Sequence, residues 1–156
     1  MNSKQICSIA FVIVSTLSAV INFSVHAEEV ANSPVGLWKN IDDVTGKPKA
    51  LIRITETDGV LTGKIERLFR EPGEEQNPKC TECEGANKDQ PILGMTILVG
   101  LKKDGDEYDD GTILDPKNGK VYKSKLVLEE RAKKLNVRGY IGFSWIGRSQ
   151  VWVREQ

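Results

Sequence analysis

The sequence has 156 residues with 22 Lys and Arg against 22 Asp and Glu, so its formal net charge is zero at pH 7. This balance provides neither a basic stripe for nucleic acid nor a cationic face for anionic membranes. The single histidine, His26, leaves little room for imidazole catalysis or for a histidine zinc site.

The N-terminus carries the three parts of a secretory signal. Lys4 precedes an apolar run over residues 6–23, which ends at the small-x-small sequence Val25-His26-Ala27. We predict that residues 1–27 are cleaved on export to the periplasm or the exterior. A retained transmembrane anchor is disfavoured because the uninterrupted apolar part is shorter than the ~20 residues that a bilayer requires. The mature chain would contain no histidine, so we expect no Ser-His-Asp or Cys-His catalytic site.

Residues 28–34 are predicted to be a flexible lead-in, and residues 35–156 a single β domain. Gly36-x-Trp38 opens the first strand, and the next two β-rich runs meet at Asp58-Gly59, a strong hairpin signal. Further turns are expected near Asp104-Gly105 and at 115–119, where Asp-Pro and Asn-Gly pairs occur. Two more strands, 133–143 and 149–156, end the chain.

This order of hairpins predicts an all-β fold. About eight strands without a long crossover favour an antiparallel up-and-down barrel, since closure removes the exposed edges of a sheet. A barrel of eight strands encloses either its own side chains or one small ligand.

A long polar loop over residues 70–91 contains Cys80 and Cys83. An even cysteine count in an exported chain favours a structural disulfide. Redox catalysis is less favoured because the surroundings are acidic and contain no predicted helix, and a metal clip lacks two further ligands. No metal and no cofactor are therefore expected. The loop is either a disulfide-braced lid over one barrel mouth or a solvated surface loop.

Aromatic side chains in or beside the strands are the candidate ligand contacts, although most large aromatics in a β domain belong to the core. An arginine facing inward among them would suit a ligand carboxylate. Strand alternation places Arg138 and Tyr140 on one face, with Leu135, Val137 and Ile141 on the other, and does not decide which face is internal. The candidate ligand-binding residues are Trp38, Tyr122, Arg138, Tyr140, Phe143 and Trp145.

The Gly36-x-Trp38 triplet resembles the opening signature of lipocalins, in which the tryptophan closes one barrel end against an arginine near the C-terminus. That resemblance assigns the arginine role to Arg154 or Arg148, with Arg154 in the last strand. The blocks GLWKNIDDVTGKPKALIRI, KCTECEG, GTILDPKNGKVYKSKL and LNVRGYIGFSWIGRSQVW resemble, in order, domain-of-unknown-function family 2147 of secreted bacterial proteins. The resemblance covers residues 36–152 and implies a lipocalin-like barrel in the bacterial envelope, without any established activity.

The sequence thus favours a carrier of a small, partly apolar or amphiphilic molecule. The alternative is an interaction or structural domain of the envelope whose barrel is filled by its own side chains. An enzyme ranks third, because it would have to use carboxylates such as Asp115, or tyrosine and arginine, in a polar pocket. No catalytic residue is assigned, and the sequence indicates no particular oligomeric state.

Overall fold

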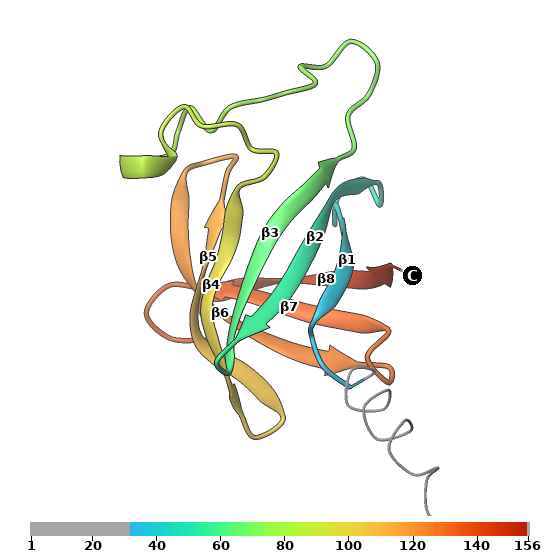
Figure 1. The fold of residues 1–156 in the computed structure, drawn as a ribbon, viewed down its shortest axis with the longest axis vertical. Helices are drawn as coiled ribbons and strands as arrows, with labels where there is room; N and C mark the ends of the chain where they lie inside the picture. The colour runs from blue at the N-terminus through green and yellow to red at the C-terminus, as the bar shows by residue number, and fades with distance from the viewer. Residues whose placement is uncertain (1–31, 156) are drawn as a thin grey trace, which may run out of the picture.

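The computed structural model describes residues 32–155, which form a closed barrel of eight antiparallel strands (Figure 1). The strands are β1 (Gly36–Ile41), β2 (Pro48–Thr57), β3 (Val60–Leu68), β4 (Thr96–Asp104), β5 (Glu107–Asp115), β6 (Lys120–Glu129), β7 (Lys134–Tyr140) and β8 (Gly147–Glu155). The predicted all-β, up-and-down barrel is confirmed. The predicted signal peptide at 1–27 lies outside the described residues.

Period-2 alternation and turn chemistry explain why these segments pair as they do. In β2, Ala50, Ile52 and Ile54 are buried, while the residues between them are more exposed. Asp58 and Gly59 both have positive φ, 51° and 75°, which gives a tight connection from β2 to β3. The sheet therefore turns at the positions that the Asp-Gly and Asn-Gly pairs indicate.

Pairing of the first strand with the last closes the barrel. Trp38 of β1 lies opposite Arg154 of β8, and Asn40 lies opposite Trp152. Each strand therefore has two neighbours, and no strand edge remains in the sheet to pair with another chain.

The antiparallel order sends the connections to two opposite ends. At one end, called here the loop end, lie the connections 42–47, 69–95, 116–119 and 141–146. The opposite end, called the Trp38 end, carries the three remaining turns and both termini of the described chain. In Figure 1 the long β3–β4 connection rises from the loop end and includes the 3-10 turn η1 (Gly85–Asn87).

The interior is occupied by the protein's own side chains. Among the largest are Trp38 and Trp152, with exposed fractions of 0% and 1%, packed with leucine and isoleucine from β2, β3, β4, β6 and β7. Within residues 32–155, no helix has both the length and the apolar character needed to cross a bilayer.

Candidate functional site

The long β3–β4 connection is braced internally. Cys80 and Cys83 form a disulfide and are almost fully buried, which confirms the predicted pairing. The backbone N–H groups of Cys80 and Asp89 bond to Gln90 O and Cys80 O at 2.9 and 3.0 Å, and Lys88 Nζ donates to Thr81 O. Residues 80–90 therefore form a compact unit, called here the cystine loop.

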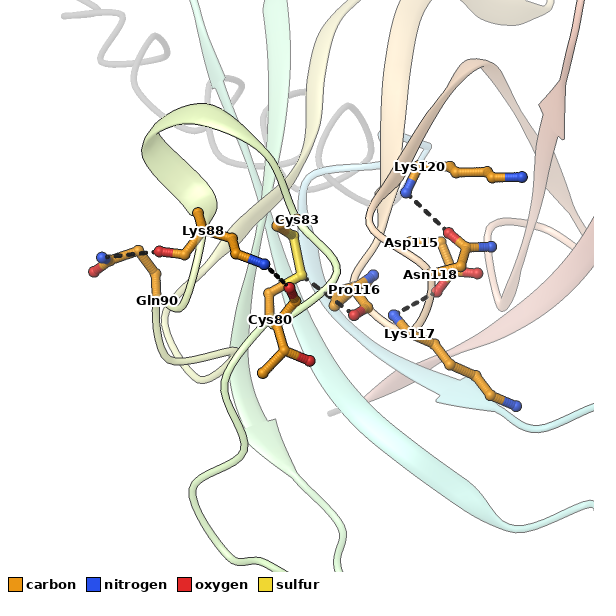
Figure 2. The surroundings of a disulfide bond; sticks show 10 residues. Cys80, Cys83, Lys88, Gln90, Asp115, Pro116, Lys117, Asn118 and Lys120 are labelled. Atoms are coloured by element: carbon orange, nitrogen blue, oxygen red, sulfur yellow. Dashed lines mark hydrogen bonds between the residues drawn. A yellow bond between two sulfur atoms is a disulfide. The ribbon is translucent and has the colours of Figure 1, made fainter.

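The cystine loop packs against the turn between β5 and β6 (Figure 2). Cys80 Sγ lies 3.3 Å from Pro116 O. Gly119 approaches the loop so closely that an added Cβ would lie 1.8 Å from Glu82 O, and its φ of 69° also disfavours other residues. In the turn itself, the backbone N–H groups of Lys117 and Lys120 donate to Asp115 Oδ1 and Asn118 Oδ1 at 3.0 and 2.9 Å.

A hollow of about 370 Å³ lies between the cystine loop, the β5–β6 hairpin and the residue after β7. Its apolar wall is formed by Leu114, Val121 and Ile141. Leu114 is buried on the outer face of the barrel because the cystine loop covers it, whereas Val121, its cross-strand partner, is 62% exposed. The polar groups that line the hollow come from Glu84, Asn87, Lys120 and Tyr122.

The Trp38 end is closed by a different set of contacts. The guanidinium carbon of Arg154 lies 4.2 Å from the centroid of the Trp38 ring. Arg154 also donates to the carbonyls of Ala132, Val35 and Ser33 at 2.6, 3.0 and 2.6 Å, and burial lowers its pKa. The structure therefore places Trp38 and Arg154 together, far along the strands from the hollow. Arg148, the other arginine considered for this place, instead pairs with Asp43 at the loop end.

The barrel interior contains polar atoms among the apolar side chains. Asn40 Nδ2 donates to Gln150 Oε1 at 3.1 Å. Ser124 Oγ and Trp152 Nε1 are buried and have no hydrogen-bond partner among the described residues. Ser124 lies between two glycines of the neighbouring strands, Gly111 and Gly139.

The register settles which face of β7 is internal. Val137 is 2% exposed and lies opposite Leu126, so Arg138 and Tyr140 occupy the outer face. Arg138 donates from Nε to Ser144 O at 2.5 Å and from Nη1 to Ser149 Oγ at 3.0 Å. Tyr140 donates to Asp109 Oδ1 at 3.3 Å, and burial together with the Asp109 charge raises its pKa.

The other candidate aromatics lie at the loop end. Tyr122 is half-buried, and its hydroxyl accepts a bond from Asn118 Nδ2 at 3.1 Å. Phe143 and Trp145 stand on the exposed β7–β8 connection, stacked with ring centroids 4.5 Å apart. Of the six candidate ligand contacts, the structure therefore brings one, Tyr122, to the hollow.

Comparison with known proteins identifies the family. The family DUF2147, described as an uncharacterized protein conserved in bacteria, matches residues 36–154. The chain belongs to the DUF2147 family. A similar solved structure is a Helicobacter pylori protein, HP1028, described as belonging to the lipocalin family; it is 14% identical, with a TM-score of 0.65 over 80% of this chain and 84% of that one. This likeness shows a lipocalin-like fold for the DUF2147 barrel. No curated protein matches the chain.

Sequence reasoning missed the residues that make the hollow. Ile141 was expected on the same face as Leu135 and Val137, but it is 64% exposed because β7 ends at Tyr140 and the chain turns away. Leu114 was not singled out, since alternation alone does not show that a distant loop covers an outward residue. The Asn118-Gly119 pair was the available sequence signal for this region, because it predicted the turn beside the hollow. It did not predict the contact of Gly119 with Glu82.

Proposed function

We propose that this DUF2147 protein is exported and binds a small, partly apolar molecule in the hollow at the loop end. The observation that carries the proposal is the composition of that hollow, in which an apolar wall of Leu114, Val121 and Ile141 stands beside Lys120. Ligand sites commonly combine such a wall with a few polar groups in a volume of about 300–1,000 Å³.

The position of the hollow distinguishes this proposal from binding inside the barrel. Large side chains occupy the barrel axis, whereas the hollow lies at the rim and is open to solvent. A molecule with an apolar chain and an anionic head fits this site, because its chain can cover Val121 while its head approaches the Lys120 ammonium. Glu84 limits the affinity for anions and favours a molecule with a single negative charge.

Export is part of the proposal. It is supported by the predicted signal at residues 1–27 and by the Cys80–Cys83 disulfide, since disulfides persist in oxidising compartments. We expect the protein purified from its own envelope to begin near Glu28, and intact-mass measurement tests this. A full-length mass in the soluble envelope fraction would contradict it.

Binding is tested first by native mass spectrometry of the protein purified from its own envelope. An additional mass that disappears on denaturation identifies the molecule. In a second measurement, a dansyl-labelled undecanoic acid is titrated against the wild type and Val121→Glu. We expect at least a tenfold loss of affinity, because a second carboxylate enters the wall of the hollow. Val99→Glu is the matched control, since Val99 is 49% exposed on β4 away from the hollow. Equal affinity of the two variants would exclude the hollow as the site.

A second function is favoured by a separate observation, the filled interior. Trp38, Trp152 and the surrounding aliphatic residues occupy the volume that carriers of this fold class use for ligands. The barrel would then act through its surface as an interaction or structural domain. Absence of both co-purified mass and fatty-acid uptake, with concentration-dependent sedimentation or partner capture, would favour this function over ligand binding.

A further inference from the structure

The connection between β7 and β8 presents an unusual concentration of exposed apolar side chains. Ile141, Phe143, Trp145 and Ile146 have exposed fractions of 64%, 61%, 72% and 58%. We call these four residues the apolar tip. Most large apolar side chains of the barrel are buried. A cluster of four exposed ones is therefore a candidate contact surface.

The apolar tip is held in one shape. Ile141 N bonds to Ile146 O at 3.1 Å, and Ile146 N bonds to Phe143 O at 2.9 Å. The outward-facing Arg138 braces the tip from below by donating to Ser144 O. The parallel stack of Phe143 on Trp145, with an interplanar angle of 3°, completes a preformed projection. Preformation lowers the conformational cost of binding whatever the tip contacts.

The size of the tip argues against a protein partner. The rings of Phe143 and Trp145 expose about 200–330 Å² together if each carries the usual 150–250 Å², and the two isoleucines add a smaller area. A stable protein interface buries about 800 Å² on each partner, so the tip is too small to form one alone. A projecting pair of aromatic rings flanked by isoleucines is instead typical of residues that enter the interfacial layer of a bilayer, where tryptophan is enriched.

The charges beside the tip agree with a lipid surface. Lys120 shares the lining of the hollow with Ile141 and with one acidic residue, Glu84, and Lys123 lies opposite Tyr140, the last residue of β7. Neither lysine belongs to an ion pair within residues 32–155, and both are exposed. The balanced charge of the whole chain gives no broad cationic face, so these two lysines add to an attachment that the apolar tip provides.

We propose that the apolar tip inserts into the headgroup layer of a lipid bilayer and docks the barrel reversibly on a membrane surface, with Lys120 and Lys123 near anionic headgroups. The tip shares Ile141, and its flanking charge Lys120, with the small-molecule site. Phe143 and Ile146 do not line the hollow, so variants of these two residues separate the two activities.

The chain contains a natural probe for the test. Trp38 and Trp152 are buried, whereas Trp145 is the exposed tryptophan of the described residues. The folded protein is mixed with vesicles of phosphatidylcholine and of phosphatidylcholine with 30% phosphatidylglycerol. We expect a blue shift of tryptophan emission and at least a threefold fall in acrylamide quenching, stronger with the anionic vesicles. Lipids brominated near the headgroup should quench Trp145, and Trp145→Phe should remove the response.

The decisive variant is Phe143→Ser with Ile146→Ser, which keeps Trp145 as the reporter. We expect it to lose vesicle co-sedimentation at least tenfold while retaining fatty-acid uptake. Its control, Val99→Ser with Val153→Ser, removes two exposed apolar side chains from the barrel wall and should bind vesicles as the wild type does. Lys120→Gln with Lys123→Gln should weaken binding to anionic vesicles and leave binding to phosphatidylcholine vesicles unchanged; this variant is compared on vesicles only, because Lys120 also lines the hollow.

Three results would overturn the proposal. The first is an unchanged emission with both vesicle types. The second is an equal loss of vesicle binding in the control variant, which would mean that adsorption does not depend on the tip. The third is concentration-dependent self-association without lipid that the Phe143 and Ile146 substitutions abolish, which would make a second copy of the chain the occupant of the tip.

Discussion

Arg154 covers the face of Trp38, with its guanidinium carbon 4.2 Å from the ring centroid, and donates to three backbone carbonyls around it. Two of these carbonyls, those of Ser33 and Val35, directly precede β1, and the third, that of Ala132, belongs to the β6–β7 turn. One side chain of the last strand therefore ties that strand to two segments that are far apart in the chain.

Arg154→Lys should destabilise the fold by about 2–4 kcal/mol, because lysine cannot stack on the indole while donating to three carbonyls. Urea unfolding followed by circular dichroism measures this loss. Arg53→Lys is the control, since Arg53 pairs with Glu66 on the surface and should cost less than about 1 kcal/mol. If the two variants were equally stable, the contacts of Arg154 would contribute no more than a surface ion pair.

Gly119→Ala should displace the cystine loop, because the new Cβ would collide with Glu82 O. Gly46→Ala is a matched control, since Gly46 has nearly the same φ, 70° against 69°, but nothing within 4 Å of an added Cβ. Both variants carry the strain of an alanine at positive φ, about 1 kcal/mol. Any further destabilisation of Gly119→Ala measures the collision with Glu82. We expect an excess of at least 1 kcal/mol and faster proteolysis within residues 70–91. Equal stability loss and equal proteolysis of the two variants would show that the cystine loop moves away from the new Cβ at no cost.

Removal of the disulfide by Cys80→Ser with Cys83→Ser should cost about 2 kcal/mol in the chain-entropy treatment of so short a loop. The barrel should remain folded, because the strand pairing does not depend on this bond. Intact-mass measurement provides the first check, since the wild type should gain about 2 Da on reduction. An unchanged mass would mean that the pair is not oxidised in the isolated protein.

The pKa of Asp43 should lie below its usual 3.8, because Arg148 donates hydrogen bonds to its carboxylate. This pair stabilises the folded state above the unfolded pKa of Asp43, and the contribution is lost as the pH falls through the lowered folded value. NMR titration of the carboxyl carbon should show the pKa returning toward 3.8 in Arg148→Gln. Asp42 is the control, because its lowered pKa arises first from the Thr45 N–H group. Insensitivity of Asp43 to the substitution would contradict the pairing in solution.

Ser124→Ala should leave stability unchanged or raise it by up to about 1 kcal/mol. The buried Ser124 Oγ has no partner among the described residues, so alanine removes the cost of an unsatisfied hydroxyl. Thermal unfolding measures the change. A loss greater than about 1 kcal/mol would mean that an ordered water or a bound group satisfies Ser124 inside the barrel.

The sequence by itself determined the barrel and most of its turns. Strand alternation, as in residues 50–54, depends only on neighbours in the chain and can be recognised locally. The same holds for the turn pairs Asp58-Gly59 and Asn118-Gly119. The pairing of Cys80 with Cys83 was also predictable, because an even cysteine count in an exported chain favours a disulfide and two thiolates lack the further ligands of a metal site.

Only the tertiary structure decided which residues make the candidate site. Burial of Leu114 depends on a loop that begins more than twenty residues earlier in the chain, and exposure of Ile141 depends on where β7 leaves the sheet. The face of Arg138 depends on the register of β7 against β6, because a shift of one residue would exchange the two faces of the strand. Such contacts join segments distant in the chain, so local pattern fixes the strands, and the closure of the barrel fixes what each side chain meets.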